Sequence, residues 1–402
     1  MDLDFIKKLV KTNDSKIVML VLDGIGGLQI ETDGLTELET AKTPYLDKLA
    51  KHGVCGLHIP VGAGVTPGSG PGHLGIFGFN PVKYKVGRGV LAAMGTGFAL
   101  DPGDVAARGN FCTVDKEGKV LDRRAGRISS EKNKELCKLL SEKIHIPGVE
   151  VFIQTVKEHR FLIVFRSVGL SGDLNDTDPQ EIGKKPLEPK ANSPDAEKTV
   201  KIVKDFLMQA KKILADQHPA NMILTRGYSQ KPVWPSFQEV FGIKSAAIAG
   251  YPMYRGLAWL LGMDLLECGD KLEAEISSLE KNWDKYDFFF IHIKPTDSSG
   301  EDGDFDRKVK VIEEVDKLLP RIIKLEPDVI IVTGDHSTPA LLKSHSWHPV
   351  PLLIWSRYCR TDNVEKFGER ECIKGALGPR LPAVEILPIA LANAKRLEKY
   401  GA

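Results

Sequence analysis

Short apolar segments recur along the chain, and each ends in a polar turn. Uninterrupted apolar runs of this length are typical of strands that are buried on both faces of a parallel sheet. The pattern therefore predicts buried strands within residues 16–24, 221–227, 244–252, 287–297 and 328–336.

Amphipathic patterns with helical spacing lie between these segments, at 43–53, 193–217 and 304–324. The first two begin with Thr-Pro and Ser-Pro. Proline is favoured in the first turn of a helix because the N–H that it lacks would have no partner there. Alternation of strands and helices predicts an α/β sandwich with a mostly parallel sheet.

The middle of the chain has a different pattern, with short alternating strands and hairpin-like turns between about 108 and 166. A segment rich in proline, aspartate and lysine, 175–195, follows as a linker or ordered loop. We therefore expect a smaller α+β cap domain at 108–190, inserted into a discontinuous main domain at 1–107 and 191–402.

Composition narrows the class of protein. The chain has 402 residues, of which 42% are apolar and 27% charged, as in globular proteins, and a net charge of +1 argues against a dedicated nucleic-acid binder. No secretory signal and no membrane-spanning apolar run is evident, and the six cysteines are scattered singly. These features favour a cytoplasmic protein with reduced thiols, and a homo-oligomer is compatible with them.

Acidic and imidazole side chains follow several of the predicted strands. Asp23 ends the first, Asp297 lies just beyond a later one, Asp335 and His336 end another, and His345 follows nine residues on. Ligands of open α/β sheets bind at the carboxyl ends of the strands, so these segments should converge. A lone aspartate there is more often a helix cap, but the joint pattern favours two divalent metal ions, as in many phosphoryl-transfer sites.

Ser69 lies between glycines in VTPGSGPGHLGIFGF (65–79), directly before a predicted helix. Glycines allow a ligand to approach the backbone, and a helix amino terminus favours an anion. A metal ion would activate the hydroxyl as a nucleophile, whereas the alternative interpretation is a simple helix cap.

Several arginines lie beside glycines or in apparent loops. Their planar guanidinium groups match phosphate and carboxylate, although most arginines are solvated surface groups. The candidates are Arg88, Arg108, Arg127, Arg226 and Arg255, of which the last two follow predicted strands.

Taken together, DGIGG, TPGSGPGHLGIFGFNP, YKVGRGVLAAMGTGFAL, IHIKPTDSSGEDGD, TGDHSTP and HSWHPVPLLIW resemble the alkaline phosphatase superfamily. Within it they are similar to the archaeal-type cofactor-independent (2,3-bisphosphoglycerate-independent) phosphoglycerate mutases. The resemblance extends from about Val18 to Ile386 and rests on the order of the motifs. It implies an alkaline-phosphatase-like three-layer sandwich with an inserted cap domain.

The resemblance also implies roles for individual residues. One metal ion would be held by Asp23, Ser69, Asp335 and His336, and the other by Asp297 and His345. Many relatives have D-x-x-x-H where this chain has Asp297 and Glu301, so Glu301 is a candidate ligand and the metal preference is open between Mn²⁺ and Zn²⁺, with Mg²⁺ or Co²⁺ as alternatives. Candidate substrate-binding or site-lining residues are His73, Arg108, Arg127, Arg226, Arg255, His292, Lys294 and His348.

The implied activity is the interconversion of 3-phosphoglycerate and 2-phosphoglycerate through a phosphorylated Ser69, with the cap domain excluding water from the phosphoenzyme. The alternatives are a metal-dependent phosphatase or another phosphomutase of the same superfamily, and a non-enzymatic metal-binding protein. The expected partner is a small phosphorylated substrate, with no nucleic acid and no membrane.

Overall fold

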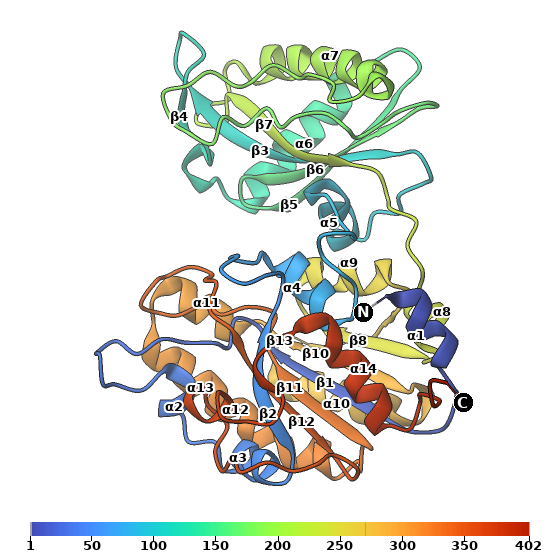
Figure 1. Cartoon of the computed structure of the whole chain (residues 1–402). Helices are drawn as coiled ribbons and strands as arrows, with labels where there is room; N and C mark the ends of the chain where they lie inside the picture. The colour runs from blue at the N-terminus through green and yellow to red at the C-terminus, as the bar shows by residue number, and fades with distance from the viewer. Residues whose placement is uncertain (1, 270, 402) are drawn as a thin grey trace. The chain divides into compact units, whose positions relative to one another are not determined.

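The structure, a computed structural model, describes residues 2–269 and 271–401 and divides into two compact units (Figure 1). Unit 1 comprises Met1–Lys85 and Trp234–Ala402, and unit 2 comprises Val86–Val233. No helix in the described part of the chain is long and apolar enough to cross a membrane.

Unit 1 is built on an eight-stranded sheet with the order β13-β2-β12-β11-β1-β10-β8-β9. Its central strands are parallel, whereas β12 is antiparallel to both neighbours. This confirms the expected α/β sandwich with a mostly parallel sheet. The strands are β1 (Ile17–Leu22), β2 (Val54–Ile59), β8 (Ser245–Ala249), β9 (Asp264–Leu265), β10 (Phe288–Ile293), β11 (Val329–Thr333), β12 (Val350–Ser356) and β13 (Gly378–Pro382).

Successive residues of a strand point to opposite faces of the sheet, and in the central strands nearly all of them are apolar. Both faces are therefore apolar, and helices cover both. On β10, Phe289 packs in a core with residues of α3, α10 and α12, whereas Phe288 and Phe290 contact Phe237 and Phe77 on the other face. The longer helices are α3 (Pro44–Lys51), α4 (Ser69–Ile76), α9 (Pro252–Leu260), α10 (Leu272–Asn282), α11 (Pro295–Asp302), α12 (Phe305–Ile323) and α14 (Ile386–Asn393), and the shorter are α1 (Leu3–Leu9), α2 (Glu37–Thr40), α8 (Phe237–Phe241) and α13 (Glu369–Cys372).

Unit 2 has a separate five-stranded antiparallel sheet in which four strands have the order β4-β3-β6-β5, and the fifth, β7, also pairs with β3. Helices α6 and α7 share an apolar core with this sheet, and α5 lies against β3. The elements are α5 (Arg88–Gly95), β3 (Val105–Val114), β4 (Val120–Asp122), α6 (Ser130–Lys143), β5 (Glu150–Lys157), β6 (Arg160–Arg166), α7 (Glu197–Leu214) and β7 (Met222–Ser229).

The limits of unit 2 differ from the segment 108–190 expected from the sequence. Helices α5 and α7 and strand β7 all belong to unit 2, which therefore begins earlier and ends later. The prediction that 221–227 forms a strand of the parallel sheet is wrong, because β7 pairs antiparallel with β3. An apolar run indicates that a strand is buried but does not indicate in which sheet.

Candidate active site

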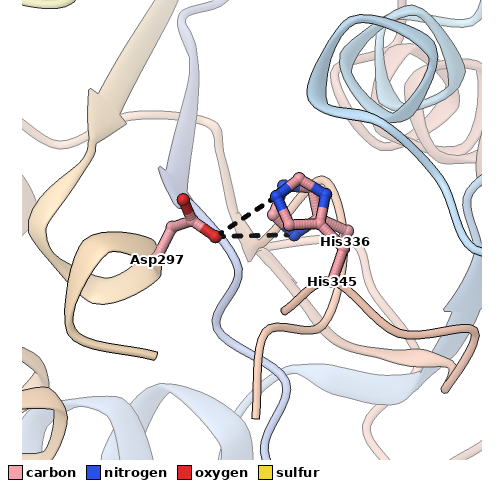
Figure 2. Close-up of side chains that lie close together, drawn as sticks. All are labelled: Asp297, His336 and His345. Atoms are coloured by element: carbon pink, nitrogen blue, oxygen red, sulfur yellow. Dashed lines mark ion pairs between the residues drawn. The ribbon is translucent and has the colours of Figure 1, made fainter. Parts of the chain in front are cut away.

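The carboxyl ends of three neighbouring parallel strands bring the predicted ligands together. Strand β1 lies between β10 and β11, so Asp23 after β1 is flanked by Asp297 and by Asp335 with His336. Two groups have ligand atoms within 4.8 Å of one another: Asp23, Asp335 and His336, and Asp297, His336 and His345. Figure 2 shows the second group, in which both imidazoles lie toward the Asp297 carboxylate.

The three carboxylates of these groups are fully buried, at 0% exposure each. Two oxygen atoms, Asp23 Oδ1 and Asp335 Oδ2, accept no hydrogen bond. Burial and the neighbouring Asp23 raise the pKa of the Asp335 carboxyl well above its usual value. Unpaired buried carboxylate oxygens beside imidazole nitrogens form a donor set that fits Mn²⁺ or Zn²⁺.

Hydrogen bonds determine which nitrogen of each histidine is free to bind a metal ion. The Thr338 hydroxyl donates to Asp297 Oδ1 at 2.6 Å, so it accepts a hydrogen bond from His336 Nδ1 at 2.9 Å. His336 Nε2 is then free, 3.3 Å from Asp23 Oδ1 and 3.2 Å from Asp335 Oδ2. Likewise, His345 Nδ1 donates to the Pro67 carbonyl at 3.0 Å, which leaves Nε2 free, 3.6 Å from Asp297 Oδ1.

Ser69 is the first residue of α4, and its hydroxyl oxygen lies 3.3 Å from His336 Nε2. Gly72 allows this helix to approach the ligand loop closely, since a Cβ there would be 2.3 Å from the Asp335 carbonyl oxygen. His73 on the same helix is fully buried, and its Nδ1 donates to the Ser69 carbonyl at 2.8 Å. Burial lowers the pKa of His73 to about 4, so the ring is neutral near pH 7.

A cation and a phenol lie against the remaining oxygen of Asp23. Asp23 Oδ2 accepts hydrogen bonds from Tyr254 (2.5 Å), His292 Nε2 (3.1 Å) and Lys294 (3.1 Å). Burial would raise the pKa of Asp23, but His292 and Lys294 hold it well below its usual value. Burial lowers the pKa of Lys294, but Asp23 and Asp297 outweigh burial and raise it. Tyr254 was missed by sequence reasoning, which considered only its neighbour Arg255.

Two further candidates, Glu301 and His348, lie outside the two metal groups. Glu301, on α11, belongs to neither group; its Oε1 is 3.8 Å from His345 Nε2, and its side chain is 55% exposed. His348 is partly buried, and its Nδ1 lies 3.0 Å from the Ser346 hydroxyl.

Unit 2 holds a separate group of arginines. Arg108 on β3 is paired in register with Arg226 on β7, so the two side chains share one face of the sheet. Arg226 contacts Asp176 (3.3 Å) and Asp178 (3.6 Å), whereas the buried Nε of Arg108 has no partner. Burial, followed by the nearby Arg88 and other guanidinium groups, lowers the pKa of Arg108 to about 10. We call Arg88, Arg108 and Arg226 the arginine group; it fits an anion.

The remaining two predicted arginines lie elsewhere. Arg127 is exposed in the turn after β4, with a positive φ of 53°. Arg255 on α9 donates to the carbonyls of Ala249 (3.4 Å) and Leu266 (3.0 Å) in unit 1. These two hydrogen bonds, both from Nη1, therefore attach α9 to the neighbouring edge of the sheet.

Comparison with known proteins identifies the family. The family model described as 2,3-bisphosphoglycerate-independent phosphoglycerate mutase matches residues 50–221. A protein of Aquifex aeolicus, named "Probable 2,3-bisphosphoglycerate-independent phosphoglycerate mutase", is 55% identical over 410 residues, covering 100% of both chains. The chain belongs to this mutase family.

Solved structures agree with this membership. The structure of a Pyrococcus horikoshii protein matches with a TM-score of 0.83 and 30% identity, covering 97% of this chain and 100% of that one. The cofactor-independent phosphoglycerate mutase of Thermoplasma acidophilum matches with a TM-score of 0.72 and 29% identity, covering 94% and 100%. These comparisons confirm the resemblance to cofactor-independent phosphoglycerate mutases that the sequence motifs indicated.

Proposed function

We propose that this chain interconverts 3-phosphoglycerate and 2-phosphoglycerate by transferring the phosphoryl group to Ser69 and back. The observation that carries the proposal is the position of the Ser69 hydroxyl, 3.3 Å from His336 Nε2, which in turn lies beside two buried carboxylate oxygens that accept no hydrogen bond. The names of the relatives support the choice of phosphoglycerate as the substrate.

Two divalent ions, Mn²⁺ or Zn²⁺, would complete this site. Asp23, Asp335, His336 and Ser69 would hold one ion, because His336 presents its free Nε2 to both carboxylates. Asp297 and His345 would hold the other, with Glu301 within reach of the same imidazole. When bound, such ions lower the pKa of a coordinated hydroxyl and neutralise charge on phosphoryl oxygens.

The reaction itself requires two in-line transfers. In the first, the Ser69 oxygen forms a bond to phosphorus as the bond from phosphorus to the 3-oxygen of glycerate breaks. In the second, the 2-oxygen of the retained glycerate attacks the phosphoserine, and Ser69 is released. No other reactant is consumed, and the reverse reaction passes through the same phosphoserine with the two transfers in the opposite order.

Other side chains of this chain would support these transfers. Lys294 and Tyr254 hold Asp23 in place, as their hydrogen bonds to its Oδ2 indicate. The amino terminus of α4 favours the negative charge of a phosphoryl group at Ser69. We further propose that the arginine group binds a phosphate or carboxylate, since Arg108 has an unpaired buried donor. Such a step of glycolysis and gluconeogenesis would place the protein in the cytoplasm.

Mass spectrometry of the protein quenched during turnover of 3-phosphoglycerate with Mn²⁺ tests the proposal. We expect phosphate on the peptide that carries Ser69, together with 2-phosphoglycerate made without added bisphosphoglycerate. Release of inorganic phosphate without 2-phosphoglycerate would identify a phosphatase instead. Label on any other residue would contradict the role of Ser69.

A further inference from the structure

Lys308 is a fully buried lysine on α12, at 0% exposure. Lysine is almost never buried completely without partners. Its Nζ donates to three backbone carbonyls, those of Gly24 (3.0 Å), Gly26 (3.1 Å) and Thr338 (2.9 Å). An ammonium has three N–H donors and a neutral amine only two, so three acceptors at these distances indicate the charged form.

A buried carboxylate, Glu37, balances the charge of Lys308. Glu37 Oε1 lies 3.8 Å from Nζ and is equally buried. Burial lowers the pKa of Lys308, and the Glu37 and Glu369 carboxylates oppose this shift. The Glu37 carboxylate also accepts hydrogen bonds from the backbone of Leu28 (3.2 Å) and Ala340 (2.7 Å).

The three carbonyls belong to the two loops that carry the candidate metal ligands. Gly24 directly follows Asp23, and its N–H donates to Asp335 Oδ1 at 3.3 Å. Thr338 lies two residues after His336, and its N–H donates to the carbonyls of Gly24 (3.2 Å) and Gly26 (3.0 Å). Lys308 and Glu37 therefore attach to both loops, Lys308 through carbonyls and Glu37 through N–H groups.

Thr338 connects this attachment to the metal groups themselves. While its carbonyl accepts from Lys308, its hydroxyl bonds Asp297 Oδ1 (2.6 Å) and His336 Nδ1 (2.9 Å). A shift of Thr338 would therefore change the orientation of one proposed ligand in each metal group. Such outer contacts orient metal ligands and fix the histidine tautomer.

The two lysines near the site, one partly exposed and one buried, have different contacts. Lys294 touches the carboxylates of Asp23 (3.1 Å) and Asp297 (2.6 Å) and is 25% exposed, so a bound cation would compete with it. Lys308 bonds backbone carbonyls behind these side chains. Its contacts can therefore persist when ions are bound.

We infer that Lys308 is a positioning residue whose ammonium acts as a permanent internal cation, holding the loops after β1 and β11 at the separation that metal binding requires. The inference rests on the proposed function, because it assigns Lys308 to the metal groups of that site. Sequence reasoning missed it, since one lysine in an amphipathic helix has the appearance of a solvated surface charge.

Mn²⁺ binding without substrate, followed by electron paramagnetic resonance, tests this role directly. Lys308→Met keeps the hydrocarbon chain and removes the charge, and we expect Mn²⁺ affinity to fall about tenfold or more. At saturating Mn²⁺, kcat for 3-phosphoglycerate should fall, while KM stays within about twofold because Lys308 would not touch the substrate. Lys310→Met, at an exposed position on the same helix, is the matched control and should behave as the wild type.

A second variant, Lys308→Gln, keeps an N–H donor but no charge, and circular dichroism would establish whether each variant folds. We expect Lys308→Gln to bind Mn²⁺ with an affinity between those of the wild type and Lys308→Met. Wild-type Mn²⁺ affinity in a folded Lys308→Met would overturn the inference. Failure of both variants to fold, with Lys310→Met intact, would also overturn it, because Lys308 would then serve the fold and not the site.

The same measurements separate this inference from the proposed function. If the wild type binds Mn²⁺ but forms neither phosphoserine nor 2-phosphoglycerate, the proposed function fails, and the difference in Mn²⁺ affinity still decides the role of Lys308. If the wild type binds neither Mn²⁺ nor Zn²⁺, both fail.

Discussion

Unit 1 and unit 2 each hold side chains of like charge close together, but they compensate these charges differently. In unit 1, Asp23 and Asp297 share one cationic partner, Lys294, and the third fully buried carboxyl, Asp335, contacts no lysine or arginine among the described residues. In unit 2, Arg226 already contacts Asp176 and Asp178. Unit 1 therefore has the larger uncompensated charge and should depend more on a bound ion.

The two groups are also positioned by different means. Parallel strands with their carboxyl ends at one edge place Asp23, Asp297 and Asp335, whereas antiparallel register places Arg108 opposite Arg226. In both cases a packed apolar core keeps side chains of like charge close together despite their mutual repulsion. Each group leaves a buried atom without a partner, and a ligand of opposite charge can satisfy it.

Replacement of the proposed nucleophile should have the largest effect. Ser69→Ala removes the atom that would accept the phosphoryl group, and we expect kcat to fall on the order of 10⁴-fold or more. Ser344→Ala, in the exposed turn before His345, is the control and should retain full activity. A steady-state assay of 2-phosphoglycerate formation measures both. Substantial activity in Ser69→Ala would contradict the role of Ser69 as the phosphoryl acceptor, and with it the functional difference drawn between the two units.

Removal of one carboxylate charge should weaken the dependence of the stability of unit 1 on metal ions. Burial, and after it repulsion from Asp23, disfavours a charged Asp335, so Asp335→Asn removes both costs and we expect the metal-free protein to gain on the order of 1 kcal/mol in unfolding free energy. The variant should also lose most of the rise in Tm that saturating Mn²⁺ gives the wild type, since the affinity for the ion falls. Asp302→Asn, at an exposed position on α11, is the control, and calorimetry with and without Mn²⁺ is the measurement. An unchanged response to Mn²⁺ would contradict the ligand role of Asp335.

The arginine group should respond to anions and not to metal ions. Arg108→Met removes the unpaired donor, and we expect binding of inorganic phosphate and 3-phosphoglycerate to weaken by about 1.5–3 kcal/mol, with Mn²⁺ affinity unchanged. Isothermal titration calorimetry measures all three ligands. Lys138→Met, exposed on α6, controls for a general loss of positive charge. A parallel loss of Mn²⁺ affinity would show that the two groups are not independent.

Glu275 on α10 is a third buried ionisable group, and protonation neutralises it. Its replacement should have the smallest effect on the protein. Burial raises the pKa of Glu275 to about 8, and its Oε2 has no hydrogen-bond partner. The unfolded chain loses this proton near pH 4.5, whereas the folded chain keeps it to about 8, so the contribution to stability falls as pH rises through this window. Glu275→Gln should remove that pH dependence and stabilise the protein at pH 8 by on the order of 1 kcal/mol. Urea unfolding at pH 6 and pH 8 measures it, and an unchanged pH dependence would contradict the assignment.

The sequence alone predicted four buried strands of unit 1, β1, β8, β10 and β11, and the residues at the carboxyl ends of β1, β10 and β11. That inference needed only strand periodicity and the rule that parallel strands end at one edge, so the convergence of Asp23, Asp297, Asp335 and His336 followed from local patterns. The order of the motifs then identified the family, because such an order rarely arises by chance in an unrelated chain.

Only the tertiary structure decided which segments belong to which sheet and which cations face the site. The apolar run at 221–227 shows the same burial in either sheet, and Arg255 follows a strand of unit 1 but bonds the carbonyls of Ala249 and Leu266. The residues around Lys308 and Tyr254 in the sequence do not indicate their contacts. Tyr254 bonds Asp23, 231 residues away, and Lys308 bonds Gly24, 284 residues away. Periodicity along the chain reports whether a side chain is buried, whereas the partner of a buried charge depends on contacts between distant segments, which form only when the whole core is packed.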